Sequence, residues 1–338
     1  VSWDAQADIQ EAVLKGKAIV VCLMDYFKFF DSMEPEFMCK FIIDLGIDED
    51  YAHMILDMYQ KMKRYIKIGN TYGKPFHPTN GYGQGDAFSM LVALMLVSVQ
   101  FSMIQQRYPE VRMGSAVDDR NIRGPLDMVM RAYGEMAEFD RLAGHFNNPK
   151  KLAMIATCPK LRKKLSKINL TAQDPPVHPR IFTVETLVGD FLTTSAAPAR
   201  AKSEQRVGAA LHVVKRAVIC PTTQALRARA VAACAIPKML QGTQWTFPGA
   251  RSLKKLRTDI LTAIWGTNRS MRCAEVVTAI LNDPLKIDPW AATIARCFLN
   301  AKRILKKSDQ RLKQFCEATT LSKAKPEDAQ KVQGPTQT

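Results

Sequence analysis

The sequence predicts an α+β fold up to about residue 195, followed by a basic, all-helical region. Three observations support this prediction. An apolar run over residues 18–24 is typical of a buried strand that ends at Asp25. Strand-like and helix-like patterns alternate up to about residue 195, and only helical patterns follow beyond about residue 200. With 338 residues, of which 47% are hydrophobic, the chain is long enough for roughly two to three domains.

The first 195 residues divide into short elements. An amphipathic helix is expected over residues 4–16, with Asp4 as its N-cap and Gly16 at its end. The buried strand follows it. The further elements are expected as helices over 34–46, 48–62, 86–107 and 126–144, β-like pieces around a turn at Gly69 and Asn70, a strand on each side of Asp118 and Asp119, and strands over 152–157 and 186–192.

The remainder of the chain is predicted to be helical. The helices are expected over 204–219, 223–236, 251–266 and 291–315. From about Thr320 onward the sequence is polar and rich in Lys, Pro, Gln and Thr, and we expect a disordered tail.

Positive charge is concentrated in the helical part. The chain has 48 Lys and Arg against 32 Asp and Glu, a net charge of +16. Residues 201–338 hold 24 Lys and Arg and 9 Asp and Glu, whereas residues 1–200 hold 24 and 23. A basic region beside a part that carries acidic clusters suggests that one part holds a polyanion and the other acts on it. The alternative is that these cations are solvated helix faces.

Cysteine, histidine and apolar patterns argue against several classes of protein. The eight cysteines are scattered without a C-x-x-C pair, which is typical of reduced thiols in a nuclear or cytoplasmic protein rather than a secreted one. The five histidines lack metal-ligand spacing, so a zinc site is not expected. The apolar stretch Met90–Ile104 is shorter than a membrane span of about 20 residues, so we expect a buried helix and no membrane partner.

Three carboxylates are the main candidates for chemistry. Asp25 closes the buried strand, and Asp118 and Asp119 lie at the expected tip of a hairpin. Neighbouring carboxylates repel each other and resist burial, so they require a cation or another compensating group. If the strand end and the hairpin tip meet, three carboxylates surround one point, and we expect a magnesium site there. The alternative is an aspartate that caps a strand and an unrelated Asp-rich turn.

Four short motifs follow one another along the chain. They are D-Y-F-K-F-F-D from Asp25 to Asp31, N-G-Y-G-Q-G-D-A-F-S from Asn80 to Ser89, A-V-D-D from Ala116 to Asp119, and the set Gly144, Asn148 and Lys151. The chain resembles reverse transcriptases, most closely those of non-LTR retrotransposons, from about residue 18 to 192, and Val188-Gly189 resembles a fifth motif. Ala116 replaces the family's tyrosine, and G-D-A-F-S-M replaces G-D-P-L-S-P.

The resemblance implies a right-hand polymerase palm, an antiparallel sheet backed by helices, followed by a basic helical thumb. It assigns residues 1–17 to a residual fingers or connecting helix, 18–195 to the palm, 196–319 to the thumb and 320–338 to the tail. Most of the fingers are expected to lie upstream of this chain. The implied activity is RNA-directed DNA synthesis in a retroelement, with an RNA template, a DNA primer and deoxynucleoside triphosphates as partners.

The resemblance also assigns roles to individual residues. Two Mg²⁺ ions, or Mn²⁺, would support in-line phosphoryl transfer, with the carboxylates of Asp25, Asp118 and Asp119 as catalytic and metal-binding groups and the backbone carbonyl of Tyr26 as a further ligand. Nucleotide-binding roles are implied for Phe30, Gln84, Gly85 and Lys151. Phe30 would exclude a 2′-hydroxyl and so select deoxynucleotides.

Each nucleotide-binding role has a simpler alternative, and so does the activity. Phe30 is otherwise a core residue, the glycine loop an ordinary turn and Lys151 a solvated cation. An RNA-dependent RNA polymerase and a non-catalytic nucleic-acid-binding remnant of a retroelement are the competing functions. The sequence leaves the oligomeric state open.

Overall fold

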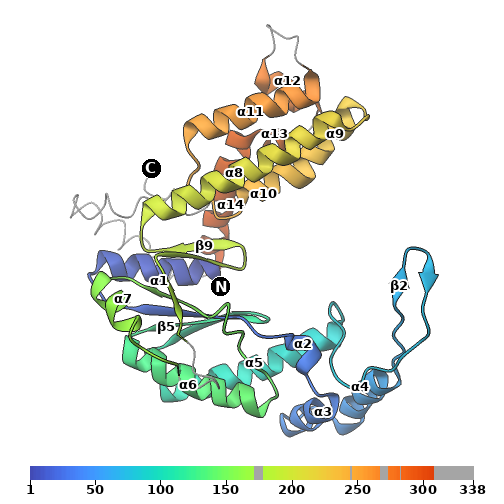
Figure 1. Ribbon diagram of the computed structural model, residues 1–338, viewed down its shortest axis with the longest axis vertical. Coiled ribbons are helices and arrows are strands. Elements are labelled where there is room, and N and C mark those ends of the chain that lie inside the picture. Colours follow the sequence, from blue (N-terminus) through green and yellow to red (C-terminus); the bar gives the residue numbers. More distant parts are fainter. Residues whose placement is uncertain (171–177, 244–245, 267–272, 282, 308–338) are drawn as a thin grey trace. The chain divides into compact units, whose positions relative to one another are not determined.

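The structure is a computed structural model that describes residues 1–170, 178–243, 246–266, 273–281 and 283–307 (Figure 1). The chain forms two compact units, which are described separately. The first contains residues 18–182 together with Val1 and Trp3–Ala5. The second contains Ser2, residues 6–17 and the chain from Thr183 onward. The four domain assignments made from the sequence stay predictions.

A five-stranded sheet forms the centre of the first unit. Its strand order is β4-β5-β1-β6-β7, and all neighbouring pairs are antiparallel except β6 and β7. The strands are β1 (Val20–Met24), β4 (Arg112–Ala116), β5 (Asp119–Gly124), β6 (Ala153–Ala156) and β7 (Arg180–Phe182). The α+β class and a mostly antiparallel sheet are therefore confirmed, and the two strands beside Asp118 and Asp119 form the expected hairpin.

Helices α5 and α6 pack on one face of this sheet (Figure 1). Alternate side chains of β1, from Val20 through Cys22 to Met24, enter the core on that face because successive side chains in a strand point to opposite sides. The helices of this unit are α2 (Phe29–Ser32), α3 (Pro35–Asp44), α4 (Glu49–Lys61), α5 (Ala87–Arg107), α6 (Leu126–Leu142) and α7 (Pro159–Leu165). The four helices expected between residues 34 and 144 are confirmed within about two residues at each end.

Helix α5 is long and apolar enough to cross a membrane by length and composition. It was expected instead to be a buried helix. Its side chains at Val92, Leu96 and Ile104 are buried in the core of the first unit, and Gln100 is bonded to Asp140 of α6. The contacts of this face are those of a core helix.

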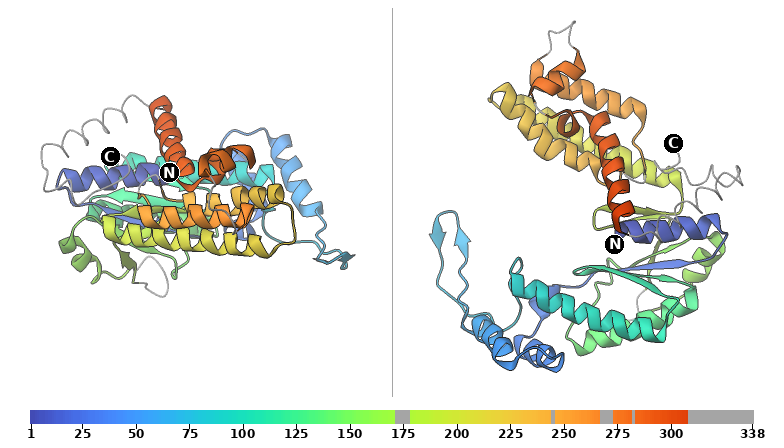
Figure 2. Two further views of the ribbon diagram at one scale, coloured as in Figure 1. Left: turned by 90° about the horizontal axis from the view of Figure 1, so that it is seen from above. Right: turned by 180° about the vertical axis from the view of Figure 1, so that it is seen from behind.

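A small hairpin leaves the end of α4. Strands β2 (Lys67–Ile68) and β3 (Thr71–Tyr72) pair antiparallel across the turn at Gly69 and Asn70, which agrees with the expected turn. Gly69 has a φ of 60°, the left-handed conformation that such two-residue turns require. The hairpin projects from α4, away from the central sheet, as Figure 1 and Figure 2 show.

The second unit is mainly helical. Its elements are most of α1 (Ser2–Leu14), β8 (Val184–Leu187), β9 (Asp190–Thr193), α8 (Ala196–Ile219), α9 (Gln224–Ala230), the π-helical segment η1 (Val231–Ala235), α10 (Ile236–Leu240), α11 (Ala250–Trp265), α12 (Ala274–Leu281), α13 (Pro284–Ile287) and α14 (Pro289–Lys307). Helix α1 is bonded to the hairpin that β8 and β9 form. The Gln6 side-chain amide donates to the Thr193 carbonyl at 2.9 Å and accepts from the Thr193 backbone amide at 2.7 Å.

Several boundaries differ from those expected. The strand predicted over 186–192 is wrong, because Val188 and Gly189 adopt left-handed conformations and turn the chain into the hairpin β8–β9. Asp4 is not a cap, since α1 begins at Ser2. Helix α8 begins at Ala196 rather than residue 204. The expected continuation of the last helix over 308–315 and the disordered tail lie outside the described residues.

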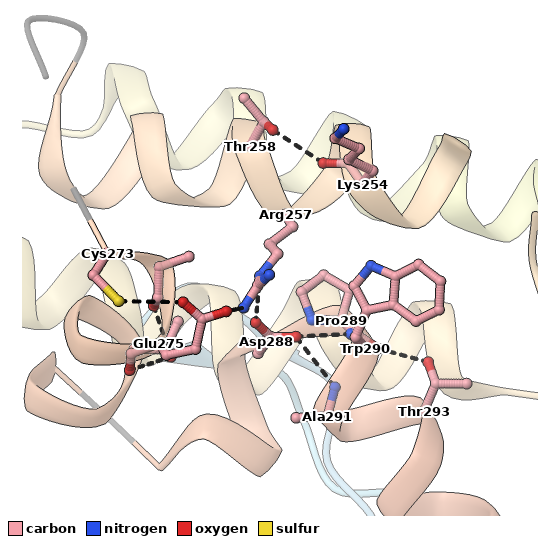
Figure 3. A network of polar contacts seen from close by, with 12 residues as sticks. Lys254, Arg257, Thr258, Cys273, Glu275, Asp288, Pro289, Trp290, Ala291 and Thr293 are labelled. Carbon is pink, nitrogen blue, oxygen red and sulfur yellow. Dashed lines mark hydrogen bonds and ion pairs between the residues drawn. The ribbon is translucent and has the colours of Figure 1, made fainter. Parts of the chain in front are cut away.

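An ion-pair network joins the later helices of the second unit (Figure 3). The Arg257 guanidinium on α11 contacts the carboxylates of Glu275 and Asp288, each at 2.6 Å. The other oxygen of Asp288 accepts from the backbone amides of Trp290 and Ala291 and so caps α14. This network explains one arginine of the basic region as a structural residue.

Candidate functional site

The three candidate aspartates gather at one end of the central sheet. In the β1–β5 register Met24 lies opposite Arg120, so Asp25 follows and Asp119 precedes this last pair at the same sheet end. Asp118 occupies the two-residue turn between β4 and β5, where Ala116 pairs with Asp119. Val117, the other turn residue, has a φ of 63°, and the Ser115 hydroxyl donates to its carbonyl at 2.9 Å. Two stretches more than 90 residues apart therefore meet.

The three carboxylates influence one another electrostatically. Burial raises the pKa of the Asp119 carboxyl, and the negative charges of Asp118 and Asp25 raise it further. The Lys151 ammonium acts in the opposite direction. The carboxylates repel each other as anticipated, and one nearby cation offsets part of that repulsion.

Lys151 supplies this cation through a direct contact. Its Nζ donates to Asp25 Oδ1 at 2.8 Å, and this hydrogen bond raises the pKa of Lys151. Backbone pairing brings the two segments together, because the Asn148 amide donates to the Asp25 carbonyl at 2.7 Å and the Phe27 amide donates to the Phe146 carbonyl at 2.9 Å. The fourth motif therefore lies beside the first, and its lysine is not a free solvated cation.

The donor atoms suit a hard divalent ion, but their arrangement does not form a ready cage. Carboxylate oxygens are the ligands that Mg²⁺ prefers. Within the described part of the chain, no group of three or more His, Cys, Asp or Glu side chains is arranged so that it could hold a metal ion. The Lys151 ammonium is bonded to Asp25 instead. A metal ion at this point would require Lys151 to move away from Asp25.

The glycine loop is fixed to the segment that follows Asp25. The Tyr82 amide donates to the Phe30 carbonyl at 2.8 Å, and the Gly81 amide donates to the Met33 carbonyl at 3.0 Å. Gly81 has a φ of 92°, and a Cβ there would lie 2.9 Å from the Cα of Asp31, so only glycine fits. The second motif thus packs against the helix that begins four residues after Asp25.

The nucleotide-binding candidates differ in their surroundings. Phe30 is half-buried against the core, and its ring lies 5.4 Å from that of Phe29. Gln84 and Gly85 are exposed, and Gly85 has a φ of 90°. None of the contacts described for this part of the chain joins Gln84 to the carboxylates. Lys151 is the one nucleotide-binding candidate with a direct bond to a candidate catalytic group.

The polar residues Asp86 and Ser89 at the end of the second motif have structural roles. Asp86 caps α5, since its carboxylate accepts from the Ser89 amide, and the Ser89 hydroxyl donates to the Asp86 carbonyl at 2.7 Å. The Tyr59 hydroxyl also donates to the Asp86 carboxylate. These bonds hold the end of the glycine loop at the start of α5.

Sequence reasoning missed a buried polar network directly behind the carboxylates. Arg120, the residue after Asp119, is fully buried, and its Nη1 donates to Asp140 Oδ1 at 2.8 Å and to Gln100 Oε1 at 2.6 Å. The Tyr26 hydroxyl donates to the other oxygen of Asp140 at 2.6 Å, and the Arg120 guanidinium lies 4.3 Å from the centre of the Tyr26 ring. Burial raises the pKa of Asp140, whereas Arg120 and the donated hydrogen bonds lower it.

This network fixes both strands that carry the candidate aspartates. Tyr26 follows Asp25 and Arg120 follows Asp119, and both side chains enter the face covered by α5 and α6. The Tyr26 side chain is therefore a core group, and only its backbone carbonyl is left for the metal-binding role expected of it. The missed signal was the alternation along β5, which places Arg120 on the same face as Ile122.

Comparison with known proteins gives a coarse likeness only. No family model matches the sequence, and no curated protein matches it. Among solved structures, the chain is similar to telomerase from Candida albicans in complex with a TWJ fragment of telomeric RNA, with 11% identity, a TM-score of 0.44 and coverage of 94% of this chain and 51% of that one. For the corresponding complex from Candida tropicalis, the identity is 11% and the TM-score 0.42, and the match covers 93% of this chain and 51% of that one. For apo telomerase from Candida tropicalis, the identity is 12% and the TM-score 0.39, and the match covers 91% of this chain and 54% of that one.

The chain thus spans about half the length of these telomerase chains. At these TM-scores the likeness does not establish a common fold by itself.

Proposed function

We propose that the chain contains the palm and thumb of an RNA-directed DNA polymerase of the non-LTR retroelement type. One observation carries the proposal: Asp25, directly after β1, and Asp119, at the start of the adjacent antiparallel strand β5, lie at the same end of the sheet, with Asp118 in the adjoining turn. A cluster of mutually repelling carboxylates costs folding free energy, so such clusters are typical of sites that bind a cation or carry out a reaction. The motif order in the sequence and the basic residues of 201–338 support the choice of nucleotidyl transfer.

The proposed mechanism gives each group a separate task. Asp25, Asp118 and Asp119 would hold Mg²⁺ after Lys151 has left Asp25, together with the Tyr26 backbone carbonyl. The bound ions would stabilise the charge on the attacking 3′-oxygen and the leaving pyrophosphate. Lys151, once released, would be close enough to neutralise the triphosphate. Phe30 would contact the sugar, and Gln84 and Gly85 would approach the new base pair.

Primer extension tests this function. The full chain is incubated with an RNA template, an annealed DNA primer, Mg²⁺ and deoxynucleotides, and the elongated primer is measured on a gel. We expect incorporation, and we expect Asp118→Asn to reduce it by about 10³-fold or more, because an essential charge is removed while the shape is kept. Asp127→Asn, which changes an exposed carboxylate on α6, is the matched control and should keep the incorporation of the unchanged chain.

Three outcomes would contradict the proposal. The first is that the chain incorporates no nucleotide. The second is incorporation that survives Asp118→Asn, since the carboxylate cluster would then not be the site. The third is use of ribonucleotides in preference to deoxynucleotides, which would favour an RNA-dependent RNA polymerase. In that case Phe30→Ala should leave the preference unchanged.

A second function is favoured by one observation, the bond between Lys151 and Asp25. A site whose carboxylate is already neutralised by a lysine suits a non-catalytic nucleic-acid-binding protein. This alternative predicts RNA binding that weakens with salt and is unchanged by Asp25→Asn, without any incorporation of nucleotides.

A further inference from the structure

The hairpin that leaves α4 is basic and carries no acidic residue. We define residues 63–77 as the basic arm. From Met58 to Gly85 the sequence has no Asp or Glu, and it contains Lys61, Lys63, Arg64, Lys67 and Lys74. A continuous stretch of one charge on a projecting element attracts a polyanion.

The basic arm also exposes rings that a folded protein would ordinarily bury. Tyr65 is 52% exposed, Tyr72 is 62% exposed and Phe76 is 46% exposed. Two strands of two residues each give the arm little core of its own, so these rings are not explained by packing within it. Exposed aromatic surface of this kind marks a binding surface.

Tyr65, Tyr72 and Lys67 lie close together on the arm. Lys67 and Tyr72 are directly opposite each other in the β2–β3 register, so their side chains point to the same side. The Lys67 Nζ lies 5.3 Å from the centre of the Tyr72 ring, and the Tyr65 and Tyr72 rings are 6.4 Å apart and nearly perpendicular. This face offers flat rings for stacking and an ammonium group for a phosphate.

The base of the arm is bonded to the glycine loop of the candidate site. The backbone groups of Arg64 and Phe76 donate to each other's carbonyls at 2.9 and 3.0 Å. The Arg64 guanidinium donates to the Gly81 carbonyl at 3.3 Å. A strand held on the arm would therefore run toward the loop that contains Gln84.

We propose that the basic arm binds single-stranded nucleic acid, with bases stacked on Tyr65 and Tyr72 and phosphate bound by Lys67. In choosing the template RNA as this strand, the inference rests on the function proposed above. Bases in a duplex are stacked on one another and are not free to cover the rings, whereas unpaired bases are. The positive charge favours nucleic acid over a protein partner, although Ile66 and Ile68 are exposed as well.

Fluorescence anisotropy on the full chain tests the arm. The probes are a labelled mixed-sequence RNA of about 20 nucleotides, long enough for one single-strand site, and the same RNA annealed to DNA. Replacing Tyr65 and Tyr72 together by Ala should weaken binding of the single strand about tenfold or more and leave the duplex within about twofold. The matched control replaces Phe37 and Tyr51, exposed rings on α3 and α4, and should change neither affinity.

The charge is tested separately, with a variant that leaves the rings in place. Lys67→Ala should lower the slope of log affinity against log salt for the single strand by about 0.7, the value for one lost phosphate contact. Lys40→Ala removes the same charge from α3 and should keep the slope. Circular dichroism spectra and urea midpoints equal to those of the unchanged chain establish that each variant is folded.

Unchanged RNA binding by the Tyr65 and Tyr72 variant would overturn the inference and leave the arm as a surface for a protein. An equal loss for single strand and duplex would overturn the single-strand assignment. Failure of the proposed function is distinguishable, because a chain that binds RNA through the arm and incorporates no nucleotide refutes only the polymerase. If the chain incorporates nucleotides and its RNA affinity does not depend on Tyr65 and Tyr72, only the proposed role of the basic arm is refuted.

Discussion

The ion pairs Arg120–Asp140 and Lys151–Asp25 have the same N–O distance but differ strongly in their exposure to solvent. Each joins a nitrogen and a carboxylate oxygen at 2.8 Å. The side chains of Arg120 and Asp140 are 0% and 1% exposed, whereas those of Lys151 and Asp25 are 61% and 22% exposed. Arg120 follows Asp119 directly, so adjacent residues of β5 belong to the buried polar network and to the carboxylate cluster.

The difference shows that one sheet end can combine a rigid, buried ion pair with an exposed pair that exchanges easily. Breaking a buried ion pair leaves an uncompensated charge in a medium of low polarity, which is strongly destabilising. An exposed pair is weakened by water and salt and contributes about 0–1 kcal/mol. The buried network can therefore fix the backbone of Tyr26 and Arg120, while the exposed pair can exchange Lys151 for another cation at little cost.

The largest expected effect comes from breaking the buried pair. Asp140→Ala should lower the free energy of unfolding by about 3–5 kcal/mol, because it leaves the Arg120 guanidinium buried without its carboxylate. Urea denaturation followed by circular dichroism measures this loss. Replacing both residues, Arg120→Met with Asp140→Leu, should recover most of it, since no charge is then left buried.

The matched control is Asp44→Ala, which removes an exposed carboxylate from α3 and should change stability by less than about 0.5 kcal/mol. If Asp140→Ala lowers the free energy of unfolding by no more than Asp44→Ala does, the buried pair does not stabilise the sheet end.

The next effect is expected at His145, which is buried like Arg120 and Asp140. Its Nδ1 is 2.8 Å from the Ser32 hydroxyl, and its ring is 4.6 Å from that of Phe29. Burial, together with the nearby charge of Arg120, lowers the pKa of His145 from 6.5 to about 4. Between these values the unfolded chain binds a proton that the folded chain does not, so stability falls as pH decreases through this window.

The full shift corresponds to about 3 kcal/mol, lost between about pH 6.5 and pH 4. Urea denaturation across this range should show that His145→Leu removes this part of the pH dependence, and His53→Leu, at an exposed position of α4, is the matched control. An unchanged pH dependence in His145→Leu would show that folding does not lower the pKa of His145.

The strand ending at Asp25 and the hairpin around Asp118 were predictable because their signals are local. Residues 18–24 form an uninterrupted apolar run, and turn residues flanked by β-like stretches identify the hairpin. The hairpin β8–β9 was missed because the segment from Thr186 to Leu192 has a nearly continuous strand pattern. The turn depends on the positive φ angles of Val188 and Gly189, of which only the glycine gave a signal.

The pairing of charges was not predictable, because it is set by tertiary packing. Arg120 and Asp140 lie 20 residues apart on a strand and a helix, and charged residues are seldom fully buried. The bond between Lys151 and Asp25 likewise depends on backbone pairing near Asn148, which no local pattern specifies. The sequence therefore predicts which carboxylates converge, while the cations that accompany them require the structure.

The smallest expected effect on stability comes from the exposed pair. Lys151→Met keeps the length of the side chain and removes its charge, so it should change the free energy of unfolding by less than about 1 kcal/mol, as measured by urea denaturation in low salt. Its consequence should be electrostatic, because three carboxylates then lose the cation that offsets their repulsion. Adding salt should narrow the difference from the unchanged chain, since screening weakens exposed charges far more than buried ones. Lys150→Met, one residue away, is the matched control. A loss at Lys151 as large as that at Asp140 would remove the distinction between the two pairs and make Lys151 part of the rigid framework.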